Sequence, residues 1–186
     1  MKDRFDPDLE TFLNLNLIGG NVILAGGSLR HIFFAGDEIA DFDIFFLNMH
    51  SAEILKLELE SLEAKKVFEC PRGSLTTYKY NGMKIQLITE TIYESMESLI
   101  DTFDINACCI AYNGQQLVTT RRAIRDNRRG RVTINRVDFP NATIGRLVKY
   151  GKKGFKIPGT TIDAITAKIE ADIRAGLDVN RRFYID

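Results

Sequence analysis

Apolar and polar positions alternate in short blocks along the chain, and the period of the pattern changes several times. Residues Val22 to Ala25 are continuously apolar and are followed by Gly-Gly-Ser, which predicts a buried strand that ends in a turn. A short apolar helix from Ser28 is expected next, and then a second strand that contains Asp41 and Asp43. The stretch 21–48 therefore predicts strand, turn, helix and strand in that order.

Capping residues and helical spacing predict helices on both sides of this stretch. Asp6-Pro7 is typical of a helix N-terminus, and Gly19-Gly20 is expected to stop that helix. Ser51 is expected to cap a second helix, whose apolar residues continue to Leu62. A third helix is expected over residues 92–100, where apolar residues repeat on one face.

Turn signals separate several short segments in which apolar and polar residues alternate or all residues are apolar. These segments predict strands. The expected strands are 66–70, 75–80, 83–88, 104–112 and 115–119. Asn81-Gly82 is the strongest short-range hairpin signal that a sequence offers, and Asn113-Gly114 is a second one. Residues 104–112 are so apolar that a buried strand is expected there.

The last part of the chain is basic and predicts helices. Pro140 is expected to break the chain, and helices are predicted over residues 143–155 and 161–175, with Pro158-Gly159 between them. The pattern predicts an α+β domain, with a small mixed sheet packed against helices, and a short C-terminal helical extension.

Composition places the chain among ordinary globular proteins, with 45% hydrophobic and 27% charged residues. Because the chain lacks an apolar run of membrane-spanning length and begins with an acidic stretch, neither membrane insertion nor secretion is expected, and a cytoplasmic location follows. The three cysteines, Cys70, Cys108 and Cys109, match no disulfide framework or zinc site and are expected to fill the core.

The zero net charge hides a strong asymmetry along the chain. Residues 1–110 contain 9 Lys and Arg against 18 Asp and Glu, whereas residues 111–186 contain 16 against 7. The balance is therefore −9 in the first part and +9 in the second. The second part is the one expected to attract a polyanion.

The turn at Gly26-Gly27-Ser28 predicts a phosphate site, because its backbone N–H groups and the following helix N-terminus can face one anion. Glycine turns are also common where they only end a strand or helix and bind no ligand. Asp41 and Asp43 lie at i and i+2 of a predicted strand, so both carboxylates should project from one face. Two such charges repel unless a cation lies between them, and Mg²⁺ prefers such ligands. A solvated strand edge is the alternative interpretation.

Together these parts, in the form GGSLR...DFD, resemble the signature of the polymerase-β-like nucleotidyltransferases. The catalytic heads of CCA-adding enzymes and bacterial poly(A) polymerases are the most similar. The resemblance implies the nucleotidyltransferase fold, a nucleoside triphosphate (NTP) as substrate and two bound Mg²⁺ ions. It assigns the triphosphate to Gly26, Gly27, Ser28 and Arg30, and the two metal ions to Asp41 and Asp43.

Two later segments are also similar to CCA-adding enzymes. FDINACCIAYNG, residues 103–114, resembles a strand and turn of that family, and IGRLVKYGKKGFKI, residues 144–157, resembles its basic neck helix. This likeness implies a catalytic head at residues 1–138 and a neck-like extension at residues 139–186. No segment matches the body and tail with which CCA-adding enzymes hold tRNA.

The sequence departs from the family pattern at two points. His31 replaces an acid that usually follows the arginine. The third acid of the family has Gln86 as its positional match here, and an amide cannot bind a metal as a carboxylate does. Asp104, at the start of a neighbouring apolar segment, is the alternative third catalytic acid, although it could equally be a strand-end residue.

A basic surface in the second part of the chain is expected to contact nucleic acid or the triphosphate. Its members are Arg121, Arg122, Arg125, Arg128, Arg146, Lys149 and Lys153. The last three recur at i, i+3 and i+7, which is one helical face. A basic face is often merely solvated, but here it accompanies phosphate and metal motifs.

These observations predict a Mg²⁺-dependent enzyme that moves a nucleoside monophosphate from an NTP to an acceptor hydroxyl, with RNA as the expected acceptor. Protein and small-molecule hydroxyls stay open, because fold does not settle function. The main alternative is a module that has lost turnover and binds nucleotide or RNA, with Gln86 as the sign of that loss. A purely structural α/β protein is a third interpretation.

Overall fold

The computed structural model describes residues 7–32 and 38–178. The first half of the chain contains α1 (Pro7–Leu13), β1 (Val22–Ala25), the 3-10 helix η2 (Gly27–Ile32), β2 (Phe42–Phe46), α2 (Met49–Ser61), β3 (Lys65–Glu69), β4 (Leu75–Tyr80) and β5 (Met83–Ile88). The second half contains α3 (Met96–Asp101), the 3-10 helix η3 (Asn106–Cys108), β6 (Ile110–Tyr112), β7 (Leu117–Thr119), α4 (Arg121–Arg128), α5 (Pro140–Lys152) and α6 (Gly159–Arg174).

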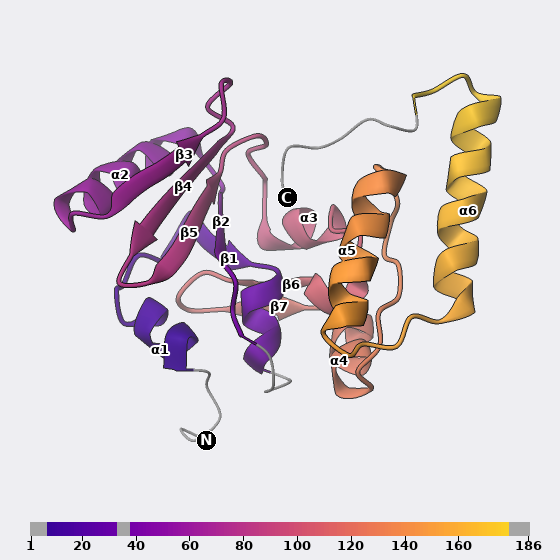
Figure 1. Cartoon of the computed structure of the whole chain (residues 1–186). Helices are drawn as coiled ribbons and strands as arrows, with labels where there is room; N and C mark the ends of the chain where they lie inside the picture. The colour runs from indigo at the N-terminus through magenta and orange to yellow at the C-terminus, as the bar shows by residue number, and fades with distance from the viewer. Residues whose placement is uncertain (1–6, 33–37, 179–186) are drawn as a thin grey trace.

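Seven strands form one mixed sheet in the order β3-β4-β5-β2-β1-β6-β7 (Figure 1). Strands β2 and β5 are parallel, and the remaining neighbours are antiparallel. Helices α5 and α6 lie side by side at the opposite end of the molecule from α2. The predicted α+β class, with a mixed sheet, packed helices and a helical extension, is confirmed.

The hairpin at Asn81-Gly82 is confirmed with the predicted bounds of both strands. Both turn residues have positive φ, 48° for Asn81 and 81° for Gly82, as a two-residue turn with the twist of the flanking strands requires. The pairing runs without a shift from Leu75 opposite Ile88 to Tyr80 opposite Met83. This hairpin fixes which residues of β5 have side chains on the same face of the sheet as Asp43 of β2.

Three predicted helix starts are wrong, each for a capping reason. Asn48, rather than Ser51, caps α2, because its side chain accepts a hydrogen bond from the Ser51 backbone N–H at 2.8 Å. Helix α3 begins only after Ser95, where a reciprocal capping box forms with Ser98. Pro140 starts α5 instead of breaking the chain, since a proline at the first helical position loses no hydrogen bond. The predicted cap Asp6 lies outside the described residues.

The strand predicted over residues 104–112 is also wrong in its first part. Only Ile110–Tyr112 forms a strand, and Asn106–Cys108 forms the 3-10 helix η3. The Asn106 side chain donates to the Ile134 carbonyl oxygen at 2.7 Å and to Thr133 Oγ1 at 3.0 Å. These contacts with a segment far along the chain override the strand preference of the apolar residues.

Two cores hold the chain together. The larger lies under the sheet and includes the stacked rings of Phe12 and Phe42, whose centroids are 4.2 Å apart. The smaller one joins Ile105 and Val132 to residues of α5 and α6, among them Leu147 and Ile165. This second core crosses the expected boundary between residues 138 and 139, so the extension packs against the head. The division into head and neck stays a prediction.

Among the described residues, no helix is both long enough and apolar enough to span a membrane. Cys70 and Cys109 are buried, as expected, whereas Cys108 is only partly buried, and all three cysteines are free. Cys108 Sγ lies 2.7 Å from the Tyr150 hydroxyl, and burial raises the pKa of the Cys108 thiol to about 11. A thiol with that pKa stays protonated at neutral pH and is no activated nucleophile.

Candidate active site

The acid pair lies at the start of the central strand β2. Asp43 is the second residue of β2 and is paired with Ala25 of β1 on one side and with Gln86 of β5 on the other. Asp41 comes directly before β2, and Asp41 and Asp43 line the same cavity. The side chain of Phe42, between them in the sequence, points into the core instead. The structure therefore places both acids on one face, as predicted.

The glycine turn lies against the acid pair. Gly26 has a φ of +88°, and a Cβ atom on it would lie 3.7 Å from Asp43 Oδ2. Gly26 N–H donates to the Ile110 carbonyl at 2.9 Å, which ties the turn to β6. Gly26 and Gly27 line the cavity, whereas Ser28 is buried behind them and its hydroxyl has no hydrogen-bond partner among the described atoms. The turn that follows β1 thus opens onto the same space as the acids.

Gln86 occupies the position expected for a third acid. It is buried, with 6% of its surface exposed, and is paired with Asp43 across β2 and β5. In the amide orientation that matches donors with acceptors, its nitrogen donates to Asp43 Oδ1 at 3.1 Å and to Asp41 Oδ2 at 3.3 Å. The amide therefore brings an oxygen of each carboxylate to one point.

Helix α5 forms the facing wall of the cavity. Arg146 Nη1 donates to Asp104 Oδ2 at 2.7 Å, and Lys149 lies one turn further along the helix. Both basic residues and Asp104 line the cavity with the acid pair, and its volume of about 630 Å³ is in the usual range of ligand sites. Arg136, which the sequence analysis missed, lines it too.

Within residues 7–32 and 38–178, no three His, Cys, Asp or Glu side chains gather in a way that could hold a metal ion. Asp104 is therefore not brought to the acid pair as a third ligand, and its partner is Arg146. The pair Asp41 and Asp43 still fits a divalent cation, because one oxygen of each carboxylate lies near the other beside the glycine turn. A single magnesium ion needs only one or two carboxylates when phosphate oxygens complete its shell.

Burial raises the pKa of Asp43 from 3.8 to about 7, and the negative charge of Asp41 acts in the same direction. The positive charges of Lys149, Lys84 and Arg146 lower it in part. Lys84 Nζ is 3.6 Å from Asp41 Oδ2. Without a cation between the acids, ionised Asp43 therefore destabilises the folded protein.

This pKa gives a stability prediction. Because the folded state binds the Asp43 proton more tightly, the stability from neutral Asp43 is present below about pH 4 and is lost as the pH rises through 7. In EDTA, Asp43→Asn should raise Tm by about 3 °C or more at pH 8 and by less at pH 5. Thermal melts at both pH values check this. A lower Tm for the variant at pH 8, or the same difference at both pH values, would contradict it.

Arg30 lies behind the cavity wall, against Tyr150, which lines the cavity. It is 1% exposed, and its guanidinium carbon lies over the rings of Phe155 and Tyr150, 4.9 and 5.5 Å from their centroids. Such cation–π contacts join η2 to helix α5 and the segment after it. His31, beside it, is also buried. The structure thus gives Arg30 a position that links the head to the extension, and it does not line the site with Gly26 and Gly27.

The predicted basic surface is divided by the fold. Arg146 and Lys149 line the cavity, but Lys153 lies outside it, at the C-terminal end of α5. Four exposed arginines follow one another along α4, which lines no part of the cavity: Arg121, Arg122, Arg125 and Arg128. The structure therefore does not bring the α4 arginines to the acid pair.

Comparison with known proteins gives two results. A family described as "Gabija anti-defense 2 family protein" (Gad2) matches residues 2–130, which is more than half of the chain. The chain belongs to the Gad2 family. No curated protein matches the sequence.

Solved structures show the fold of this Gad2 family member. The CCA-adding enzyme complexed with ATP matches with a TM-score of 0.68 and 18% identity over 94% of this chain and 46% of that one. The Thermotoga maritima CCA-adding enzyme complexed with tRNA has a TM-score of 0.65 and 19% identity over 91% and 44%. A tRNA nucleotidyltransferase complexed with a primer tRNA and an ATP analogue gives 0.57 and 17% over 85% and 49%.

At this identity the likeness shows the fold, and the predicted nucleotidyltransferase fold is confirmed. The chain spans about half the length of these structures. The acid pair, the glycine turn and Gln86 therefore lie in a fold shared with nucleotidyltransferase heads.

Proposed function

We propose that this Gad2 protein is a Mg²⁺-dependent nucleotidyltransferase, which moves a nucleoside monophosphate from an NTP to an acceptor hydroxyl on RNA. The observation that supports this most directly is one cavity with three parts. Asp41 and Asp43 lie on one wall beside Gly26 and Gly27, and the basic residues of α5 face them. We place the reaction in the anti-defence role that the family's description states.

In the proposed reaction, the acceptor hydroxyl oxygen forms a bond to the α-phosphorus. The bond from that phosphorus to the oxygen bridging to the β-phosphate breaks, and pyrophosphate leaves with the electron pair. The proton of the hydroxyl is released to solvent. The backbone N–H of Gly27 would hold the triphosphate, and Gly26, which has no side chain, would let the phosphates approach the turn. Arg146 and Lys149 would offset the charge of the triphosphate from the facing wall.

Asp41 and Asp43 would hold the metal, with two ions expected from the family resemblance. When bound, magnesium would supply positive charge that lowers the pKa of the attacking hydroxyl and offsets the charge of the leaving group. Asp104 is a positioning residue in this proposal, because its carboxylate fixes Arg146 at 2.7 Å. Gln86 would hold the two acids next to each other through its hydrogen bonds to both carboxylates.

Incorporation of label tests the proposal. The protein is incubated with each α-³²P-labelled NTP in turn, with Mg²⁺ and with either total RNA or a whole-cell extract, and the labelled RNA, protein and small molecules are separated. We expect labelled RNA with Mg²⁺ and none in EDTA. Label on a protein or on a small molecule instead would retain the transfer chemistry and refute RNA as the acceptor.

A nucleotide-binding module without turnover is the second candidate, and the position of Gln86 favours it. The amide at the third-acid position cannot act as a carboxylate ligand, and the nearby Asp104 is paired with Arg146. NTP binding by isothermal titration, together with no labelled product from any acceptor, would support this module over the enzyme.

A further inference from the structure

The face of the sheet that carries the acid pair continues beyond the cavity, onto strands β5, β4 and β3. Across these strands the paired residues are Asp43 with Gln86, Gln86 with Thr77, and Thr77 with Phe68. Residues that are paired across neighbouring strands have their side chains on the same face of a sheet. Phe68 therefore lies in one row with Gln86 and Asp43, about 14 Å from Asp43, which is three spacings between strands.

A second row of paired residues on this face consists of lysines. Lys65 of β3 is paired with Lys79 of β4, and Lys79 is paired with Lys84 of β5. This row lies two positions from the first along β4 and β5, and three positions from Phe68 along β3, where the pairing with β4 shifts by one residue. Lys84 Nζ is 3.6 Å from Asp41 Oδ2, so the lysine row ends at the acid pair.

The part of this face on β3 and β4 is open to solvent. Lys65 and Lys79 are exposed, and Phe68 has 51% of its surface exposed. Helix α2 lies on the opposite face, because its Lys56 is 3.9 Å from Glu69, whose side chain alternates with that of Phe68 along β3. We call the surface formed by Lys65, Phe68 and Lys79 the β3-β4 surface.

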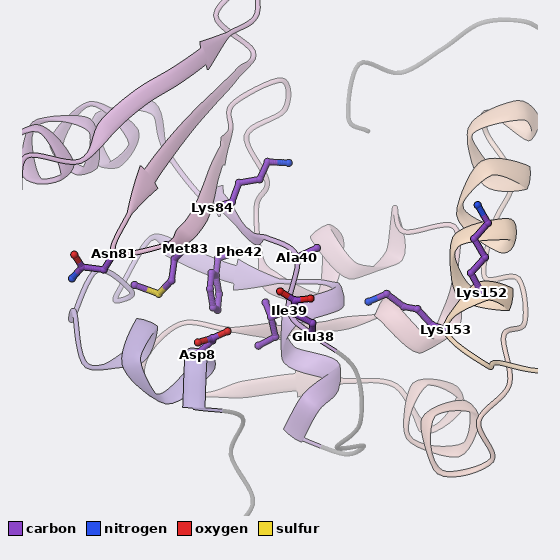
Figure 2. A pocket seen from close by; sticks show the side chains of 11 residues that line it. Asp8, Glu38, Ile39, Ala40, Phe42, Asn81, Met83, Lys84, Lys152 and Lys153 are labelled. Carbon is purple, nitrogen blue, oxygen red and sulfur yellow. The ribbon is translucent and has the colours of Figure 1, made fainter.

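Figure 2 shows the two faces of the sheet at strand β5, where Met83 and Lys84 extend to opposite sides of the strand. Met83 and Phe42 line a second cavity, which reaches the end of α5 at Lys152. This cavity lies on the face opposite the Asp43 carboxylate, because Phe42 and Asp43 alternate along β2. It contains no residue of the β3-β4 surface.

The β3-β4 surface carries positive charge that the described part of the chain does not offset. Lys65 and Lys79 lie directly opposite each other, which is unfavourable for like charges, and the single acid within β3, β4 and β5 is Glu69 on the other face, which pairs with Lys66 at 2.9 Å. Lysine on an edge strand prevents pairing with another chain. That reason does not explain Lys79, because β4 is paired on both sides. A bound polyanion would offset the repulsion.

We propose that the β3-β4 surface binds a single-stranded polynucleotide, with a base stacked on Phe68 and with Lys65 and Lys79 contacting the phosphates. The role of this strand as the acceptor rests on the proposed transfer function. A ring beside basic groups suits a single strand, because every base has a flat face and a lysine binds phosphate as a point charge. An acidic protein offers phosphate-like charge without the bases, and a duplex keeps its bases stacked inside. The row from Phe68 to Asp43 leads the bound strand toward the acid pair.

Fluorescence anisotropy of a short, labelled, single-stranded RNA, titrated without NTP, tests the inference separately from turnover. We expect Lys65→Gln/Lys79→Gln to reduce the slope of log affinity against log salt by about 1.4, for two lost phosphate contacts on a single strand. Phe68→Ala should weaken binding by about 5- to 150-fold, the range for the loss of one stacked base, and Phe68→Trp should bind at least as tightly as the unmutated protein.

Lys56→Gln/Lys66→Gln is the matched charge control, because both lysines lie near Glu69 on the α2 side of the sheet. Leu57→Ala, at a position of α2 with 66% of its surface exposed, is the control for the lost apolar side chain of Phe68. Both controls should bind RNA like the unmutated protein. Losses in the controls equal to those in the β3-β4 variants would overturn the inference.

Three other results would also overturn it: unchanged binding in the Lys65/Lys79 variant, unchanged binding in Phe68→Ala, or a duplex RNA bound as tightly as the single strand. A loss confined to Arg121→Gln/Arg122→Gln would place the polynucleotide on α4 instead. If the β3-β4 variants lose binding as expected but no protein forms product, the transfer function fails and this surface stands as the polynucleotide site. Product formed with an unchanged KM for RNA in the Lys65/Lys79 variant would retain the transfer function and overturn the inference.

Discussion

Asp43→Asn should reduce the rate of nucleotidyl transfer by about 10²- to 10³-fold, the usual cost of removing one group that stabilises charge in a transition state. Asn keeps the shape of the side chain and removes the charge that would hold a cation opposite the glycine turn. Asp41→Asn should have an effect of similar size, because Asp41 lines the same cavity and its Oδ2 shares the Gln86 amide with Asp43. Initial rates at saturating NTP and Mg²⁺ measure both effects.

The control for this loss is Asp163→Asn, an exposed residue of α6 with the same change in charge. Thermal melts separate a loss of chemistry from unfolding, and the raised pKa of Asp43 predicts that this variant has the higher Tm in EDTA. A rate within threefold of the unmutated protein would remove Asp43 from the chemistry. A loss equal to that of Asp163→Asn would do the same.

The parts of the site that were predictable from the sequence are local. Asp41 and Asp43 share a face because side chains alternate along a strand, and the glycine turn follows β1 because an apolar run ends there. Gln86 was identified through the family resemblance, as the positional match of the third acid, and the hairpin at Asn81-Gly82 fixes the register that pairs it with Asp43. Each of these features depends on residues close together in the chain.

Contacts between distant segments were not predictable in the same way. The pairing of Asp104 with Arg146 joins residues 42 positions apart, and nothing in the spacing of charges identifies such a partner. Arg30 matched a family motif, yet it packs over the ring of Phe155, which lies far along the chain. The side chain of Asn106 similarly overrode the strand predicted from its apolar neighbours.

Charge patterning predicted a basic surface and did not predict its location. The arginines of α4 and the basic residues of α5 are close in sequence, but only α5 lines the cavities. Residues 129–139 separate the two helices, and Val132 in this segment belongs to the second core. A run of like charges therefore indicates attraction to a polyanion, while the packing of the second core decides which part of the run lies near the acids.

Gln86→Glu should raise the apparent affinity for Mg²⁺ in the transfer reaction by about 10- to 100-fold, the range by which groups around a metal site change affinity or activity. The introduced carboxylate would lie beside Asp43 across β2 and β5, where the amide now donates to both acids. When no cation is bound, a third carboxylate at that point repels the other two. When a cation is bound, the third carboxylate completes its ligand set. The half-saturating Mg²⁺ concentration, measured from initial rates, should fall. In EDTA at pH 8 the variant should melt at a lower temperature than the unmutated protein.

The matched control is Gln115→Glu, on the exposed turn between β6 and β7, which adds the same charge far from the acid pair. Asp104→Asn separates the two candidates for the third acid. If Asp104 only positions Arg146, its loss displaces Arg146, which should raise KM for the NTP and leave the Mg²⁺ dependence unchanged. If Gln86→Glu instead lowers the rate and leaves the Mg²⁺ dependence unchanged, the amide donor itself is the functional group. The hydrogen bonds of 3.1 and 3.3 Å to Asp43 and Asp41 would then be what keeps the two acids aligned, and the site would work with two carboxylates and one amide.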